Sequence, residues 1–139
     1  MDPIAGHAAS RPDHPAIVTS GSVCTYRMFD RRADRLAALM ADHQVGLGDR
    51  VAVMLPNGAP WFEANVATAR LGAQLVPLNW HLLGEEISWI LADSGARLLL
   101  ADRGLATTAN EARSRAAGCG VLFVDDGFPQ ATSRSAIAK

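Results

Sequence analysis

The sequence predicts an α/β fold, a layered domain with a mostly parallel sheet that is flanked by helices and preceded by a β-hairpin. Four apolar strand candidates recur about every 23 residues, and each interval holds one helical pattern, which is the rhythm of βαβ units. The four candidates begin at Val51, Gln74, Arg97 and Val121. Two of them, 51–55 and 98–101, are nearly continuous apolar runs, as expected of parallel strands that helices cover on both faces.

The N-terminal part is expected to form the hairpin and then a helix. Residues 16–19 and 23–26 are short runs rich in β-branched and aromatic residues, and Ser20-Gly21-Ser22 between them favours a tight turn. Thr25 can cap the helix that follows. Apolar residues then recur at the spacing of one helical face, at Phe29, Ala33, Leu36 and Met40. The charged face is interpreted as solvated surface and comprises Arg27, Asp30, Arg31, Asp34 and Arg35.

Start and stop signals mark the three helices between the strand candidates. The first is expected over residues 60–71, with a proline at its first position and Gly72 just past its end. The second has Glu85 and Glu86 in its first turn, where the helix dipole favours carboxylates. It is expected to turn three apolar residues inward, Ile87, Ile90 and Leu91. The third is expected over 106–117.

Composition and charge narrow the classes of partner. The 139 residues fit one ordinary domain, and the formal net charge of −1 leaves no basic field to attract nucleic acid. No apolar run approaches the roughly 20 residues that span a bilayer, and the start lacks a secretory signal, so we expect no transmembrane segment and a cytoplasmic location. Cys24 and Cys119 stand alone, which favours two reduced and partly buried thiols.

Most of the motifs that a catalytic or metal site would require are absent from the sequence. It contains no Gly-x-Ser-x-Gly elbow and no P-loop, and Lys139 is the only lysine. The four histidines lie at spacings that build no metal cluster. Gly46-Leu47-Gly48 precedes a strand, whereas a dinucleotide fingerprint follows one. We therefore assign no catalytic residue and no metal ligand.

A series of short segments occurs in an order that points to one enzyme family. The segments are Gly-Asp-Arg-Val-Ala-Val at 48–53, Leu-Pro-Asn at 55–57, Leu-Gly-Ala at 71–73, Val-Pro-Leu-Asn at 76–79 and Asp-Ser-Gly-Ala at 93–96. Together with flanking matches they cover about residues 12–102. This stretch resembles the opening region of acyl-CoA synthetases and other adenylate-forming, AMP-binding enzymes. The resemblance is greater to fatty-acyl or aryl-CoA ligases than to peptide-synthetase modules.

The resemblance implies a two-step reaction in the complete enzyme. A carboxylic acid, with a fatty acid as the favoured substrate, reacts with ATP to give an acyl-adenylate, and the thiol of CoA then displaces AMP; ATP, Mg and CoA are the cofactors. The family's phosphate loop, magnesium-holding acid and catalytic lysine have no counterpart in this chain. We therefore expect a scaffold portion of an acid–thiol ligase, a partial subdomain of the adenylate-forming fold that is inactive and binds none of these cofactors alone.

The resemblance also indicates where a ligand would lie in the complete enzyme. In related synthetases, two loops that correspond to 79–82 and 102–107 lie beside the CoA nucleotide. The candidate cofactor-binding residues are Asn79, Trp80, His81 and Arg103. The structural alternative is that Asn79 closes a turn, Trp80 packs and Arg103 is solvated.

The expected organisation is a partial N-terminal α/β subdomain over residues 1–126 and a flexible tail over 127–139. Its partner would be the remainder of the adenylate-forming fold or a second copy of the chain. At least one strand edge or helix face is expected to be open and apolar, with the strands at 51–55 or 98–100 as the favoured places. Two alternatives stay open: a non-catalytic interaction or binding module derived from this scaffold, and an unrelated flavodoxin-like domain.

Overall fold

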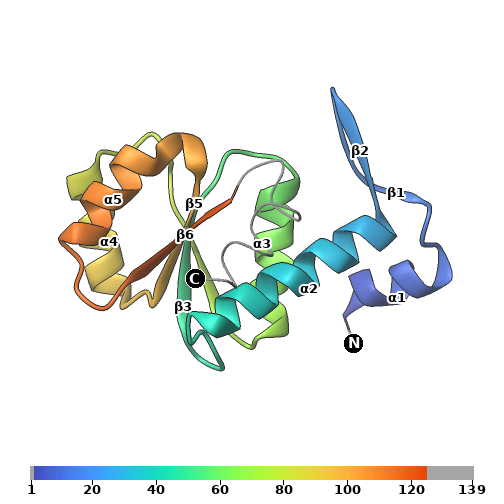
Figure 1. Cartoon of the computed structure of the whole chain (residues 1–139), viewed down its shortest axis with the longest axis horizontal. Helices are drawn as coiled ribbons and strands as arrows, with labels where there is room; N and C mark the ends of the chain where they lie inside the picture. Colours follow the sequence, from blue (N-terminus) through green and yellow to red (C-terminus); the bar gives the residue numbers. More distant parts are fainter. Residues whose placement is uncertain (1, 125–139) are drawn as a thin grey trace.

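The computed structural model describes residues 2–124 of the chain. In chain order the elements of this range are α1 (Pro3–Ser10), β1 (Pro15–Thr19), β2 (Ser22–Thr25), α2 (Tyr26–Asp42), β3 (Arg50–Met54), α3 (Ala59–Arg70), β4 (Gln74–Pro77), α4 (Gly84–Ser94), β5 (Leu98–Asp102), the 3-10 helix η1 (Arg103–Leu105), α5 (Ala106–Ser114) and β6 (Gly120–Val124). Figure 1 shows a sheet between helices, with α1 and the β1–β2 hairpin at one end of the molecule. No helix within this range is long and apolar enough to cross a bilayer.

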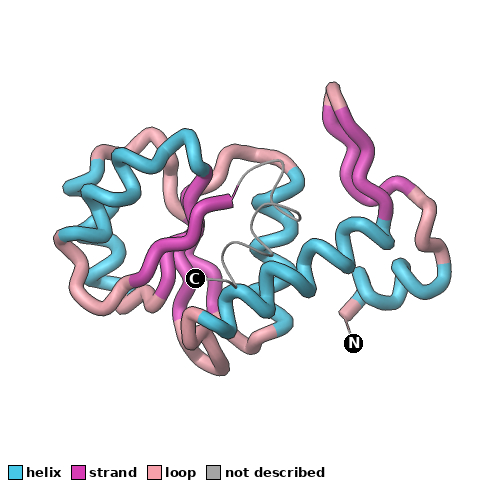
Figure 2. Tube along the Cα trace, in the orientation of Figure 1, coloured by secondary structure: helices cyan, strands magenta, loops and turns pink. Residues whose placement is uncertain are grey.

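The sheet consists of four parallel strands in the order β4-β3-β5-β6. Helices α2 and α3 cover one face and α4 and α5 cover the other, an arrangement that Figure 2 also shows. Along β3 and the residue after it, Val51, Val53 and Leu55 belong to the buried cluster on the α2–α3 side, whereas Ala52 and Met54 belong to the cluster on the α4–α5 side. Because both faces are buried, the strand is apolar at successive positions.

The strand rhythm expected from the sequence is confirmed, because every observed strand of the parallel sheet starts within one residue of its expected position. The expectation of open apolar surface around 51–55 or 98–100 is wrong. Strands β3 and β5 are the two central strands, and their apolar side chains are almost completely buried. The sheet edges are instead β4 and β6. A continuous apolar run indicates that both faces of a strand are buried. It does not indicate whether the strand lies at an edge of the sheet or in its centre.

Helix α2 forms as its pattern predicts, and its charged face differs in one respect. The backbone N–H of Met28 donates to the Thr25 hydroxyl at 3.3 Å, which confirms the N-cap. All four residues of the predicted apolar stripe are buried. The carboxylates of Asp30 and Asp34, which were expected to be solvated, both accept hydrogen bonds from Arg70 of α3. Part of the charged face therefore joins two helices.

Helix α4 also differs from its expected pattern at one position. Ile87 and Leu91 are buried as predicted, but Ile90 is only partly buried, and the small Ser88 takes the fourth inward position beside Gly84. The helix begins where the Glu86 carboxylate accepts a hydrogen bond from the backbone N–H of Leu83 at 3.0 Å. Its other face leaves Trp89 with 67% of its surface exposed.

Helix α1 and the one-turn helix η1 are the elements of the described range that the sequence pattern did not predict. The Asp2 carboxylate caps α1 by accepting hydrogen bonds from the backbone N–H groups of Ile4 and Ala5, and Pro3 occupies the first helical position. The helix has eight residues and buries none of them fully, so helical propensity alone is too weak to hold it. The tail expected over 127–139 lies outside the described residues.

Candidate functional site

In a parallel sheet the carboxyl ends of all strands meet at one edge, and the loops that follow β3, β4 and β5 gather there. The chain passes from β3 to β4 through α3 on one face of the sheet and from β4 to β5 through α4 on the other face. Strand β3 is followed by β4 on one side of it, whereas β5 is followed by β6 on the other side, so the direction in which strands are added reverses between β3 and β5. In open α/β sheets, ligands bind outside the carboxyl ends of the strands at such a switch point.

The loop after β4 carries three of the four residues that were expected to bind a cofactor. The side-chain oxygen of Asn79 accepts a hydrogen bond from the backbone N–H of His81 at 3.0 Å, and its carbonyl accepts one from Leu82 at 3.0 Å. These bonds fold the loop back on itself. The rings of Trp80 and His81 then stack, with centroids 3.8 Å apart and planes inclined by 31°. All three side chains are exposed at the surface.

The loop after β5 carries the fourth of these residues. The Asp102 carboxylate accepts a hydrogen bond from the backbone N–H of Gly104 at 2.8 Å, which initiates the one-turn helix η1. A Cβ at position 104 would lie only 2.9 Å from the same carboxylate oxygen, so this tight turn favours glycine. The turn leaves Arg103 exposed on the surface just after the strand.

The structure therefore brings Asn79, Trp80 and His81 together, while Arg103 follows a strand that is not adjacent to β4. Strand β3 lies between, so the loop of Pro56, Asn57 and Gly58 occupies the middle of this edge. Sequence analysis gave this central loop no role. Its Leu-Pro-Asn motif was recognised in the sequence. The order of the strands decides which loops are neighbours, however, and strand order cannot be predicted from a local pattern.

A second feature near this edge is a cavity of about 500 Å³ between the hairpin and the start of α3. Arg32 lines it, and the Nε of Arg32 lies 3.0 Å from a carboxylate oxygen of Glu63. The Glu63 side chain is completely buried and the Arg32 side chain is 15% exposed. Burial, and next the charge of Glu63, raise the pKa of the nearby Cys24 thiol. Arg32 thus balances a buried carboxylate beneath the cavity.

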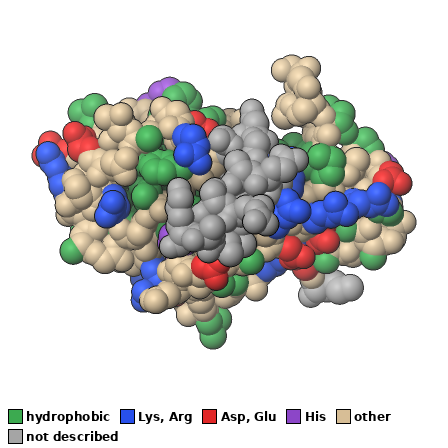
Figure 3. Space-filling view, in the orientation of Figure 1, with side chains coloured by type: hydrophobic (Ala, Val, Ile, Leu, Met, Phe, Trp, Pro, Cys, Tyr) green, Lys and Arg blue, Asp and Glu red, His purple; other side chains and the backbone are tan. Residues whose placement is uncertain are grey.

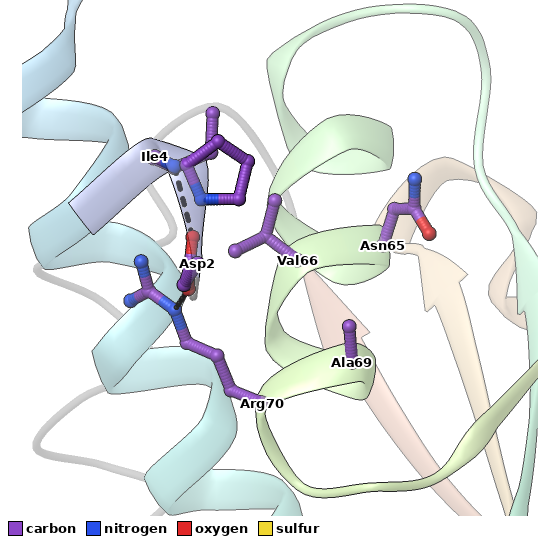
Figure 4. A pocket seen from close by; sticks show the side chains of 7 residues that line it. Asp2, Ile4, Asn65, Val66, Ala69 and Arg70 are labelled. Carbon is purple, nitrogen blue, oxygen red and sulfur yellow. Dashed lines mark hydrogen bonds and ion pairs between the residues drawn. The ribbon is translucent and has the colours of Figure 1, made fainter. Parts of the chain in front are cut away.

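Figure 4 shows a third feature, a cavity of about 390 Å³ between α1 and α3. Asp2 and Arg70 point toward one another on one side of it, and Asn65 lies apart from them on α3. Arg70 also donates to both Asp30 at 2.7 Å and Asp34 at 2.6 Å. The three carboxylates neutralise the charge of the Arg70 guanidinium, which holds the helices together. This cavity therefore offers no net positive charge to an anionic ligand.

These sites offer polar, charged and aromatic side chains. Among residues 2–124 there is no group of three or more His, Cys, Asp or Glu side chains that could hold a metal ion. On the face that Figure 3 shows, basic and acidic side chains lie side by side near α2, without a field of one sign. The carboxyl-end loops carry an indole, an imidazole, an amide and a guanidinium, groups that can stack on a ring or bind an anion.

Comparison with known proteins places these features in a family. The family model for AMP-binding enzymes matches residues 4–138. Over 93 residues, 67% of the chain, it is 38% identical to a fatty acid–[acyl-carrier-protein] ligase ScoC of Streptomyces coeruleorubidus. Over the same share it is 39% identical to a feruloyl-CoA synthase of an Amycolatopsis species. The matched segments span 18% and 19% of these two relatives, so the matched part of this chain corresponds to under a fifth of their length.

Solved structures agree with the sequence matches and confirm the predicted fold class. A fatty acyl CoA synthetase of Mycobacterium tuberculosis superposes with a TM-score of 0.79 at 27% identity, over 88% of this chain and 26% of that one. A benzoate CoA ligase of Burkholderia xenovorans LB400 gives a TM-score of 0.80 at 20% identity, over 88% of this chain and 25% of that one, which is a likeness of fold alone. The hairpin and the parallel sheet thus form the N-terminal part of the adenylate-forming fold, and an unrelated flavodoxin-like domain is excluded.

Proposed function

Because this chain belongs to the AMP-binding enzyme family, we propose that it is the N-terminal scaffold of an acyl-CoA synthetase. The complete enzyme would activate a carboxylic acid, with a fatty acid as the preferred class, by forming an acyl-adenylate from ATP and then passing the acyl group to CoA. The observation that carries the proposal is the family match along nearly the whole chain, combined with relatives more than five times as long as the matched segment.

The choice of a fatty acid rests on the names of relatives. One curated relative is a fatty acid ligase, and a solved structure at 27% identity is a fatty acyl CoA synthetase. The feruloyl-CoA synthase supports an aryl acid as the second substrate class. We propose that this chain contributes to the CoA side of the complete enzyme and not to the binding of ATP and magnesium. Stabilising a transferring nucleotide needs convergent cations or N–H groups and commonly a metal, and no metal-binding cluster occurs within residues 2–124.

The first test is the exchange of labelled pyrophosphate into ATP, which reports adenylation. We expect the purified 139-residue chain to show no exchange with any fatty or aryl acid, whereas a complete relative in the same assay does. Exchange above the no-protein level that disappears in Arg103→Ala would refute the scaffold assignment. If the complete reading frame lacked a Thr-Ser-Gly-rich loop with Pro-Lys-Gly, the alternative of a non-catalytic interaction module derived from this scaffold would be favoured instead.

The second test concerns the loops that carry Asn79, Trp80, His81 and Arg103. We propose that they lie beside the CoA nucleotide in the complete enzyme. In a complete enzyme with these loops, Arg103→Ala should raise the KM for CoA about tenfold, because one charge-assisted contact to phosphate is lost. Pyrophosphate exchange, which needs no CoA, should stay unchanged. Arg97→Ala is the matched control, because Arg97 lies just before the amino end of the same strand. Equal effects of the two variants on the KM would refute the assignment.

A further inference from the structure

The loop between β3 and α3 contains Asn57 followed directly by Gly58, which is the only Asn-Gly pair in the sequence. The other three asparagines precede a valine, a tryptophan and a glutamate. The side-chain amide of an asparagine can be attacked by the backbone nitrogen of the next residue. A glycine in that position leaves the nitrogen unshielded, because it has no Cβ. This pair is therefore the asparagine step of the sequence that is most open to such an attack.

The structure leaves both reacting groups of the pair accessible. The Asn57 side chain is exposed. Within residues 2–124, neither this side chain nor the backbone N–H of Gly58 takes part in a hydrogen bond. A Cβ placed at position 58 would meet no atom closer than the Cδ of Pro60 at 3.8 Å, so the space around Gly58 is open. The backbone there has φ 157° and ψ −173°, a conformation that favours glycine.

The other three asparagines are held by their surroundings. Asn65 lies inside α3 and Asn110 inside α5, where helical hydrogen bonds fix the next backbone nitrogen. Asn79 lies in an exposed loop at the same edge of the sheet as the Asn-Gly pair. Its side-chain oxygen accepts a backbone hydrogen bond at 3.0 Å, and the indole of Trp80 follows it. Asn79 is therefore the matched comparison within the chain.

The start of α3 favours the reaction further. Gly58 is the N-cap of this helix, and no side chain caps it. As the Gly58 nitrogen loses its proton and attacks, negative charge develops on the nitrogen and then on the amide oxygen of Asn57. The helix dipole favours negative charge at the N-terminus of a helix. The same field favours the carboxylate of the product.

We propose that Asn57 is a site of spontaneous deamidation, which converts the neutral amide of this loop into a carboxylate. The Gly58 nitrogen forms a bond to Cγ of Asn57, its proton leaves with the amide nitrogen as ammonia, and a succinimide ring results. Water then opens the ring at either carbonyl and gives aspartate or isoaspartate. Isoaspartate also adds a methylene group to the backbone where β3 leads into α3, so the charge and the shape of this edge both change. This inference does not depend on the proposed function.

Peptide mapping by mass spectrometry tests the proposal on the purified 139-residue chain after incubation in warm, mildly alkaline buffer. Cleavage after arginine and glutamate places each asparagine in its own peptide, because Glu63 lies between Asn57 and Asn65. We expect the Asn57 peptide to gain the mass difference between an amide and an acid and to contain isoaspartate, while the Asn79 peptide stays unchanged. Asn57→Gln is the matched variant and should stay unmodified, because glutamine would have to close a larger ring. A sample digested without incubation gives the background.

The same incubation in urea separates the reactivity of the sequence from accessibility in the fold. Folding should slow the reaction at Asn57 by less than about tenfold, because an exposed loop opens at little cost in free energy, whereas a site that requires global unfolding is slowed by the full folding equilibrium constant. Three results would each overturn the proposal: no mass gain at Asn57, a mass gain without isoaspartate, which indicates direct hydrolysis, or a greater slowing by folding than this.

Discussion

Replacement of Arg32 by alanine is expected to lower the free energy of unfolding by about 3–5 kcal/mol, the cost of removing one partner from a buried ion pair. The Glu63 carboxylate is completely buried, and Arg32 Nε lies 3.0 Å from it. Without the guanidinium, the charge of Glu63 has no solvent to stabilise it, so the residue must either become protonated or open the contact between α2 and α3. Urea-induced unfolding followed by circular dichroism measures the loss.

A double variant distinguishes the cost of an unpaired charge from the contribution of the pair itself. Arg32→Met combined with Glu63→Leu removes both charges and keeps apolar volume, so its stability should lie near that of the original chain or above it. The two single replacements should therefore be strongly non-additive. A loss below about 1 kcal/mol in Arg32→Ala would show that water reaches Glu63 and would contradict the burial described above.

Replacement of Arg70 by alanine should have the second largest effect, about 2–3 kcal/mol, because several charge-assisted hydrogen bonds are lost together. Arg70 lies at the end of α3 and binds Asp2 of the α1 cap as well as Asp30 and Asp34 of α2. Its removal leaves three carboxylates near one another and frees α1, which has no fully buried residue to hold it. Hydrogen exchange should show loss of protection in α1 before any change in the sheet.

The control for Arg70 is the exposed ion pair of Arg97 and Asp49, 3.2 Å apart, whose Arg97 side chain is 45% exposed. Arg97→Ala should lower the free energy of unfolding by below about 1 kcal/mol.

The pH dependence of stability provides a second check on this anchoring. Partial burial would raise the pKa of Asp2, but the hydrogen bonds from Arg70 and from Ala5 and Ile4 outweigh burial and lower it. The stabilisation from Asp2 is therefore present above pH 3.8 and is lost as the pH falls through the lower folded pKa. Unchanged α1 protection in Arg70→Ala would contradict the proposed anchoring.

The sequence was sufficient to predict the elements that depend on local patterns. The spacing of apolar runs placed the strands, and residues such as Thr25 and Gly72 marked helix ends that the structure confirms. Strand order was not predictable in this way, so the central position of β3 and the loop at Asn57 were missed. The contact of Arg70 with Asp2 joins residues 68 positions apart, and no periodicity reports such a pairing. The four residues assigned to the CoA side came from family resemblance alone, and they remain a prediction.

The order of the strands also has a consequence for how the protein is made. Each parallel strand finds its neighbours among strands that lie at or before β6, with β4 and β5 on either side of β3 and β6 beside β5. The pairings among these four strands therefore involve only residues up to 124. Domains generally fold as units, with the N-terminal one first during synthesis. On a translating ribosome, these four strands can pair with one another as soon as β6 has left the exit tunnel, so their order sets the earliest point at which this part of the sheet can form.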